Sequence, residues 1–272
     1  MIPMKVFLSA DMEGTCGIVC WPETERTTAF DYTPLQKQMS REVAAACRGA
    51  LAGGAQEVLV KDAHDTARNI DPTVLPRGIR IHRGWSGDPL SMMTGLNQEH
   101  FDAVFFTGYH AWASCTGNPL SHTMNLRNNR VWLNGGLCSE FLLNAYTAGY
   151  YGVPVAMVTG DEALCAYAKT LIPEITTVPV NLGRGNGATS LHPEEAAERI
   201  EAAAKEAVAK ASRCVVPMPE HFHMEIDFIK HPMAYSKSFY PGAQLKDDKL
   251  VCFDSDDWFE MLRFCHFVLS NA

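Results

Sequence analysis

The sequence has no apolar stretch of the length that crosses a membrane, and it has no block of basic residues. A transmembrane helix needs about 20 consecutive apolar residues, and the first apolar run is too short for a signal peptide. The formal charge is -8, from 23 basic and 31 acidic residues, which argues against nucleic acid or an anionic membrane as the main partner. We therefore expect a cytoplasmic protein that acts on a small molecule or a peptide.

Cysteine pairs at close spacing are also missing. The nine cysteines are an odd number, none of them forms a Cys-x-x-Cys motif, and the two closest are Cys16 and Cys20. In a chain of this length, this pattern predicts reduced and mostly buried thiols rather than a disulfide framework.

Alternating strand-like and helical segments indicate an α/β fold with a mainly parallel sheet flanked by helices. The chain of 272 residues is 47% hydrophobic, which is enough for a large core. We expect an α/β domain over residues 1–180 and a smaller α+β lobe over residues 181–272. Expected strands include residues 5–10, 56–61, 101–107 and 131–133, and expected helices include residues 34–51, 86–96, 138–152, 192–212 and 258–269.

Potential metal ligands follow the early strands. Asp11 and Glu13 come after the first strand, His64 after the second, and His110 after the strand of residues 101–107. Glu140 lies near the start of a predicted helix. Because ligands of open α/β sheets bind beyond the carboxyl ends of the strands, these side chains are expected to meet there.

Three carboxylates and two imidazoles suit zinc or a neighbouring first-row metal. Five side chains give two metals four positions each if one carboxylate and one water are shared, as in two-metal hydrolases. Two divalent ions also balance three carboxylates and one bridging hydroxide. Taken singly, each residue is more simply a surface or loop side chain, and only their recurrence at successive strand ends favours a metal site.

Other polar residues leave alternatives open. Asp62 either orients an imidazole or is a plain loop acid, and Tyr109 and Asn144 are candidates for the pocket wall. The row His221, His223 and Glu225 shares one face of a strand, but nothing nearby adds a ligand from a turn. The segment GRGNG from Gly183 lacks the Lys-Ser/Thr of a phosphate-binding loop, so we expect a simple connection.

Five segments, in this order and at these separations, resemble the zinc-dependent D-aminopeptidase family of the dipeptide-operon type, which assembles into a self-compartmentalising ring. They are SADMEG, VKDAH, FTGYHA, PLSHTMN and SEFLLNAYTAGYYGVPVAMVTGD. The similarity runs from Lys5 to about Val180 and continues more weakly through IDFIKHPMAYSKSFYPG.

The resemblance implies two zinc ions per subunit, with Mn²⁺ or Co²⁺ as alternatives. It implies that Asp11 bridges the ions, that Glu13 and His64 complete one site, and that His110 and Glu140 complete the other. His122, in LSHTMN, matches the catalytic histidine of the family. Ser139 stands where the family usually has glycine. The resemblance also implies a homodecamer of two stacked five-membered rings, with active sites facing an inner chamber.

The predicted function is therefore that of a dinuclear zinc aminopeptidase. It would release N-terminal amino acids, of D configuration by resemblance, from short peptides or amino-acid amides through a metal-bound hydroxide. His122 would act either as a general acid/base or as a hydrogen-bond donor to the oxyanion. The alternatives are a dinuclear amidase that acts on another amide, and a non-catalytic metal-binding ring scaffold.

Overall fold

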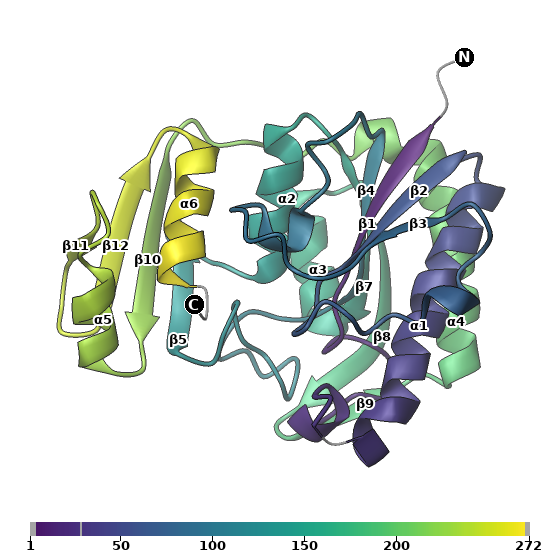
Figure 1. Ribbon diagram of the computed structural model, residues 1–272, viewed down its shortest axis with the longest axis horizontal. Helices are drawn as coiled ribbons and strands as arrows, with labels where there is room; N and C mark the ends of the chain where they lie inside the picture. Colours follow the sequence, from purple (N-terminus) through teal and green to yellow (C-terminus); the bar gives the residue numbers. More distant parts are fainter. Residues whose placement is uncertain (1–3, 28, 270–272) are drawn as a thin grey trace.

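Two β-sheets lie at opposite sides of the molecule, with helices between and outside them (Figure 1). The computed structural model describes residues 4–27 and 29–269. The larger sheet has the strand order β3-β2-β1-β4-β7-β8-β9, and all of its neighbouring strands pair in parallel except β8 and β9. This confirms the predicted α/β fold. Its strands are β1 (Lys5–Ala10), β2 (Glu57–Asp62), β3 (Arg80–His82), β4 (Ala103–Tyr109), β7 (Val155–Asp161), β8 (Thr176–Arg184) and β9 (Gly187–Ser190).

Helices cover both faces of the larger sheet. The pair α1 (Ala29–Ala52) and α4 (Pro193–Lys210) lies side by side on one face, and α2 (Glu140–Tyr150) and α3 (Glu162–Leu171) lie on the other (Figure 1). A buried stripe on α4 consists of Ala196, Ile200, Ala204 and Ala207, at helical spacing. Three of these residues are alanines, and their small side chains let α4 pack closely against α1.

The smaller sheet is antiparallel, in the order β11-β12-β10-β5-β6. Along β10 (Phe222–Phe228), every second side chain from Phe222 is buried, as expected for a sheet with one covered face. The other elements are β5 (Asn128–Leu133), β6 (Gly136–Leu137), β11 (Gln244–Leu245), β12 (Leu250–Ser255), α5 (His231–Lys237) and α6 (Trp258–Val268). Four 3-10 helices complete the described elements: η1 (Trp21–Glu23), η2 (Pro72–Val74), η3 (Ser91–Met93) and η4 (Ala211–Arg213).

Helix α6 connects the two sheets. Trp258 is buried, its ring contacts Tyr146 and Phe222, and its indole N–H donates to Thr147 Oγ1 over 3.2 Å. Tyr146 and Thr147 belong to α2, which packs on the larger sheet. The small sheet is therefore fixed to the large one through a buried aromatic cluster.

Two expectations about local structure are wrong. Residues 86–96 contain only the short η3 rather than a helix, because the Asp88 carboxylate accepts hydrogen bonds from Leu90 N and Thr94 Oγ1 and holds a compact turn. The predicted strand at 131–133 does form as part of β5, but it pairs with β10 in the smaller sheet and not with the parallel strands.

The expected division of the chain at residue 180 falls within β8. Residues 181–213 continue the larger sheet and its outer helix layer, while β5 and β6 extend the smaller sheet. The chain thus passes between the two sheets more than once, and its division into two domains stays a prediction.

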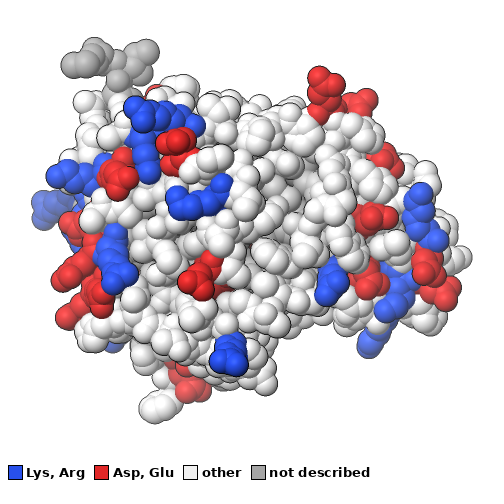
Figure 2. All heavy atoms as spheres, turned by 180° about the vertical axis from the view of Figure 1, so that it is seen from behind, with Lys and Arg blue, Asp and Glu red and all other residues white. Residues whose placement is uncertain are grey.

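Within the described ranges, no helix has both the length and the apolar character needed to cross a bilayer. Figure 2 shows the back of the molecule, where basic and acidic side chains are interspersed and a broad uncharged area lies between them.

Candidate metal centre

The predicted residues gather at the point where the order of the larger sheet reverses. Strands β2 and β3 lie on one side of β1, and β4 and β7 lie on the other. Between the carboxyl ends of β1 and β4 the connections run in opposite directions, which opens a crevice for a ligand. Asp11 and Glu13 leave β1 at this crevice, His64 follows β2 and His110 follows β4.

Glu140 reaches the same place from the first turn of α2. The helix begins here because the Ser139 side chain caps it, accepting a hydrogen bond from Leu142 N over 3.2 Å. Ser139, the departure from the family pattern, therefore supports the position of Glu140 instead of disturbing it.

The loop that carries Asp11 and Glu13 lies directly on β4. Asp11 N donates to Thr107 O and Gly14 N donates to Gly108 O, both over 2.8 Å. A Cβ atom at Gly14 would lie 1.8 Å from Tyr109 O, and one at Gly108, whose φ is +68°, would lie 2.2 Å from Asp11 O. Only glycines allow this approach, which brings the acids after β1 next to the imidazole after β4.

Asp11 faces two different imidazoles through its two oxygens. Its Oδ1 lies 3.3 Å from His64 Nδ1, and its Oδ2 lies 3.5 Å from His110 Nε2. His64 Nδ1 also lies 3.0 Å from Glu13 Oε2. On the other side, His110 Nε2 lies 3.6 Å from Glu140 Oε1. Two triads could each hold a metal ion, and they share Asp11.

A backbone carbonyl holds the outward nitrogen of each of these two imidazoles. His64 Nε2 lies 3.0 Å from Thr24 O, and His110 Nδ1 lies 2.9 Å from Ala111 O. Since a carbonyl oxygen only accepts, the outward nitrogen of each ring carries the proton. Burial lowers the pKa of each ring, but the charge of Glu13 beside His64 and of Glu140 beside His110 outweighs it and raises the pKa well above its usual range, so a positive charge belongs at the inward nitrogen of each ring.

The buried polar atoms of the cluster indicate where that charge belongs. Asp11 Oδ2, Glu13 Oε2 and His110 Nε2 are buried and have no hydrogen-bond partner among the described residues. Burial, and then the charge of Glu13, raises the pKa of Asp11 well above its usual range. Nitrogen and oxygen donors of this kind, unpaired and aimed at one point, fit zinc or a similar first-row ion.

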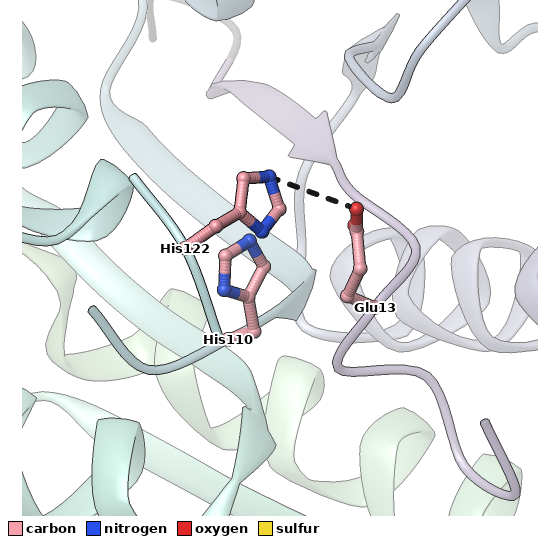
Figure 3. Close-up of side chains that lie close together, drawn as sticks. All are labelled: Glu13, His110 and His122. Atoms are coloured by element: carbon pink, nitrogen blue, oxygen red, sulfur yellow. Dashed lines mark ion pairs between the residues drawn. The ribbon is translucent and has the colours of Figure 1, made fainter. Parts of the chain in front are cut away.

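His122 lies beside this cluster on the segment before β5. Its Nε2 is 3.4 Å from Glu140 Oε1 and 3.9 Å from Glu13 Oε1. Figure 3 shows its ring against that of His110, with the centroids 4.4 Å apart and the planes at 14°. Burial, and then the neighbouring His110, lowers the pKa of His122. Glu13, His110 and His122 form a third group that could hold a metal.

The cluster opens into a cavity of about 800 Å³. This size suits a small ligand or a short peptide. Five side chains of the cluster line the cavity: Asp11, Glu13, His64, His122 and Glu140. Large apolar side chains make up part of its wall: Trp21, Trp85, Met92, Met124 and Leu126.

The remaining candidates have other roles. The Asp62 carboxylate accepts from Asn69 N and Ile70 N, and in this way it fixes the loop after β2 without touching an imidazole. Tyr109 and Asn144 bond to each other over 2.9 Å and do not line the cavity.

The histidine row on β10 is separate from the cavity. His221 and His223 are paired with Asp254, on the neighbouring strand β12, over 3.2 and 2.7 Å. Neither residue lines the cavity.

Comparisons with known proteins agree on one family. A family model described as D-aminopeptidase matches residues 4–267. A D-aminopeptidase of Bacillus subtilis (strain 168) is 33% identical over 251 residues, which is 89% of this chain and 88% of the relative. The solved structure of "Zn-dependent D-aminopeptidase DppA from Bacillus subtilis, a self-compartmentalizing protease" superposes with a TM-score of 0.88 at 29% identity, covering 96% of this chain and 95% of that one.

The contact between the Gly14 loop and β4 yields a testable prediction. In Gly14→Ala, the new methyl group meets Tyr109 O and pushes the Glu13 loop away from His110. We expect a loss of about 1–3 kcal/mol of stability and at least about tenfold weaker zinc binding, measured by competition with a chelator. Gly187→Ala is the control, since its Cβ meets nothing closer than 3.9 Å. Unchanged zinc affinity in Gly14→Ala would contradict this account of the loop.

Proposed function

The chain belongs to the D-aminopeptidase family, and we propose that it is a dinuclear zinc aminopeptidase that releases N-terminal D-amino acids from short peptides or amides. The observation that carries the two-ion assignment is the orientation of Asp11, whose two oxygens face two different imidazoles. Glu13 and His64 would complete one site, and His110 and Glu140 the other. The D configuration rests on the names of the relatives.

The hydrolytic chemistry depends on the bound ions and on His122. Zinc supplies Lewis acidity, which polarises the amide carbonyl and lowers the pKa of water. His122 Nδ1 donates to Leu120 O over 2.9 Å, so in the neutral ring Nε2 is bare and faces the cluster. Burial, and then His110, lowers the pKa of this ring, which favours its neutral form. Both features favour general acid/base catalysis over donation to an oxyanion: Nε2 takes a proton from the attacking water and returns it to the leaving amine.

The cavity favours a substrate with a positively charged amino end. Besides the three carboxylates of the cluster, Glu25, Asp65 and Asp88 line it. With the cluster carboxylates balanced by the proposed ions, the potential of Glu25, Asp65 and Asp88 attracts a free N-terminus into the cavity. The volume of about 800 Å³ limits the substrate to a short one.

Assembly into a homodecamer of two five-membered rings is part of the proposal. The structural relative is named a self-compartmentalizing protease. On this chain, Tyr235, Phe239 and Phe267 are 60%, 69% and 58% exposed. Tyr235 contacts Phe239, Phe267 contacts Tyr240, and Phe239, Tyr240 and Phe267 line one hollow beside α6. Large exposed aromatic side chains that gather in one place are typical of an interface between proteins.

A cytoplasmic location also belongs to the proposal. All nine cysteines lie within the described ranges, and all are free thiols. Free and mostly buried thiols suit a reducing compartment.

Metal replacement tests the proposed activity. Chelator-treated protein should hydrolyse neither D- nor L-aminoacyl amides and dipeptides, and zinc should restore hydrolysis with a preference for the D forms. Manganese and cobalt, assayed in parallel, show whether another ion serves better. A ring scaffold would gain only thermal stability from zinc, and a different amidase would leave the whole panel uncleaved. Either result contradicts the proposal.

The shared position of Asp11 predicts metal stoichiometry. Elemental analysis should find about two zinc ions per chain in the wild type, about one in His64→Ala and close to none in Asp11→Ala, because Asp11 serves both ions. His223→Ala is a matched control, since that imidazole lies outside the cavity and should leave both ions bound. Retention of one full equivalent by Asp11→Ala would show that Asp11 does not bridge.

His122 should affect turnover and not metal content. We expect His122→Ala to lower kcat by about 10²- to 10⁴-fold while retaining about two zinc ions. His221→Ala, on the outer surface, should match the wild type in both measurements. If His122→Ala loses zinc, His122 is a ligand together with Glu13 and His110, and the acid/base role is wrong.

A further inference from the structure

Negatively charged side chains outnumber positively charged ones in the lining of the cavity. Six are acids and one is a base, and the base is Arg127; the acids are Asp11, Glu13, Glu25, Asp65, Asp88 and Glu140. Among the described residues that line the cavity, Arg127 is thus the single permanent cation. Three of the acids belong to the candidate metal centre, so the cavity has one end that binds cations and one position that suits an anion.

The backbone of Arg127 is held while its side chain is free. Arg127 N donates to Asn125 Oδ1 over 2.7 Å, and Arg127 O accepts from Ile229 N over 3.0 Å. The side chain is exposed, and among residues 4–27 and 29–269 no hydrogen bond or ion pair involves its guanidinium. Some other exposed arginines, such as Arg48 with Glu201 and Arg263 with Glu260, are paired with acids, whereas Arg127, which lines the cavity, has no such partner among the described residues.

The segment that carries Arg127 is also attached to the metal centre. Met124 N donates to Glu140 Oε1 over 2.7 Å, and His122 lies two residues earlier in the same segment. Three residues of chain span at most about 10 Å, so Arg127 stays at a limited distance from Glu140. A dipeptide substrate in an extended conformation spans at most about 7 Å. This length is comparable to the span between Met124 and Arg127, and the long arginine side chain extends beyond its own backbone.

We propose that Arg127 binds the C-terminal carboxylate of the substrate, so that the enzyme favours short peptides with a free carboxyl end over the corresponding C-terminal amides. This inference rests on the proposed function. A peptide bound with its amino end among the acids presents its carboxylate to the remaining part of the cavity. The planar guanidinium donates two parallel hydrogen bonds to a carboxylate, which an amide cannot accept in the same way.

The test compares one peptide in two forms, D-Ala-Gly and D-Ala-Gly amide, on zinc-loaded protein at low ionic strength, where exposed charges are weakly screened. In Arg127→Ala, we expect kcat/KM for D-Ala-Gly to fall about tenfold, mainly through KM, and kcat/KM for the amide to change less than about twofold. Arg127→Lys keeps the charge but loses the fork, so it should recover part of the preference.

Arg130→Ala is the matched control. Arg130 is an exposed arginine on β5, three residues further on, and it does not line the cavity. This variant should show the wild-type ratio between the two substrates.

The outcomes separate this inference from the proposed function. Equal losses on the peptide and its amide in Arg127→Ala, or no loss on either, overturn the role of Arg127 while the aminopeptidase remains. A zinc-loaded wild type that cleaves neither substrate overturns the proposed function and this inference with it.

Discussion

The structure depends on the close packing of three buried carboxylates against the inward-facing nitrogens of three imidazoles, which calls for positive charge among them. Asp11, Glu13 and Glu140 are almost fully buried, and burying several like charges without a counter-charge is costly. Backbone carbonyls hold the outer nitrogens of His64, His110 and His122, so the rings cannot turn away without losing a hydrogen bond. The protein thus fixes the donors in the arrangement that the proposed cations require.

This constraint links the fold to the chemistry. The unfolded chain holds these ligands far apart and cannot form the site. The free energy of metal binding therefore stabilises the folded state, in which the ligands are already assembled. Close contact between the Gly14 loop and β4 and the cap of α2 by Ser139 achieve this assembly. Both features bring together residues that are far apart in the sequence, and the reversal of strand order between β1 and β4 provides the space.

Much of this arrangement could be predicted from sequence, for a physical reason. A parallel strand buried on both faces is a continuous apolar run, so a carboxylate or imidazole at its end, such as Asp11 after KVFLSA, marks the edge where ligands bind. Interactions that depend on the main chain had no such signal. The carbonyl of Thr24 that orients His64 could come from any residue, and the sequence could not decide whether Asp62 orients an imidazole or holds its own loop, which is what it does. The segment VWLNGG looks like a strand in either sheet, because its pattern does not encode its neighbours, and only tertiary packing places it beside β10.

The two sheets contribute different parts of the cavity. Most of the charged cluster lies on loops that directly follow strands of the larger sheet, and the pairing of these strands fixes where the loops begin. The wall opposite it comes from the segment before β5 and from α6, through Leu126, Arg127 and His266. Because Trp258 and the aromatic cluster around it join α6 to α2, this wall is held at a set position relative to Glu140. The segment before β5 thus carries His122 and Met124 at the cluster and Arg127 in the opposite wall, and the contact between α6 and α2 fixes how the two parts of the cavity face each other.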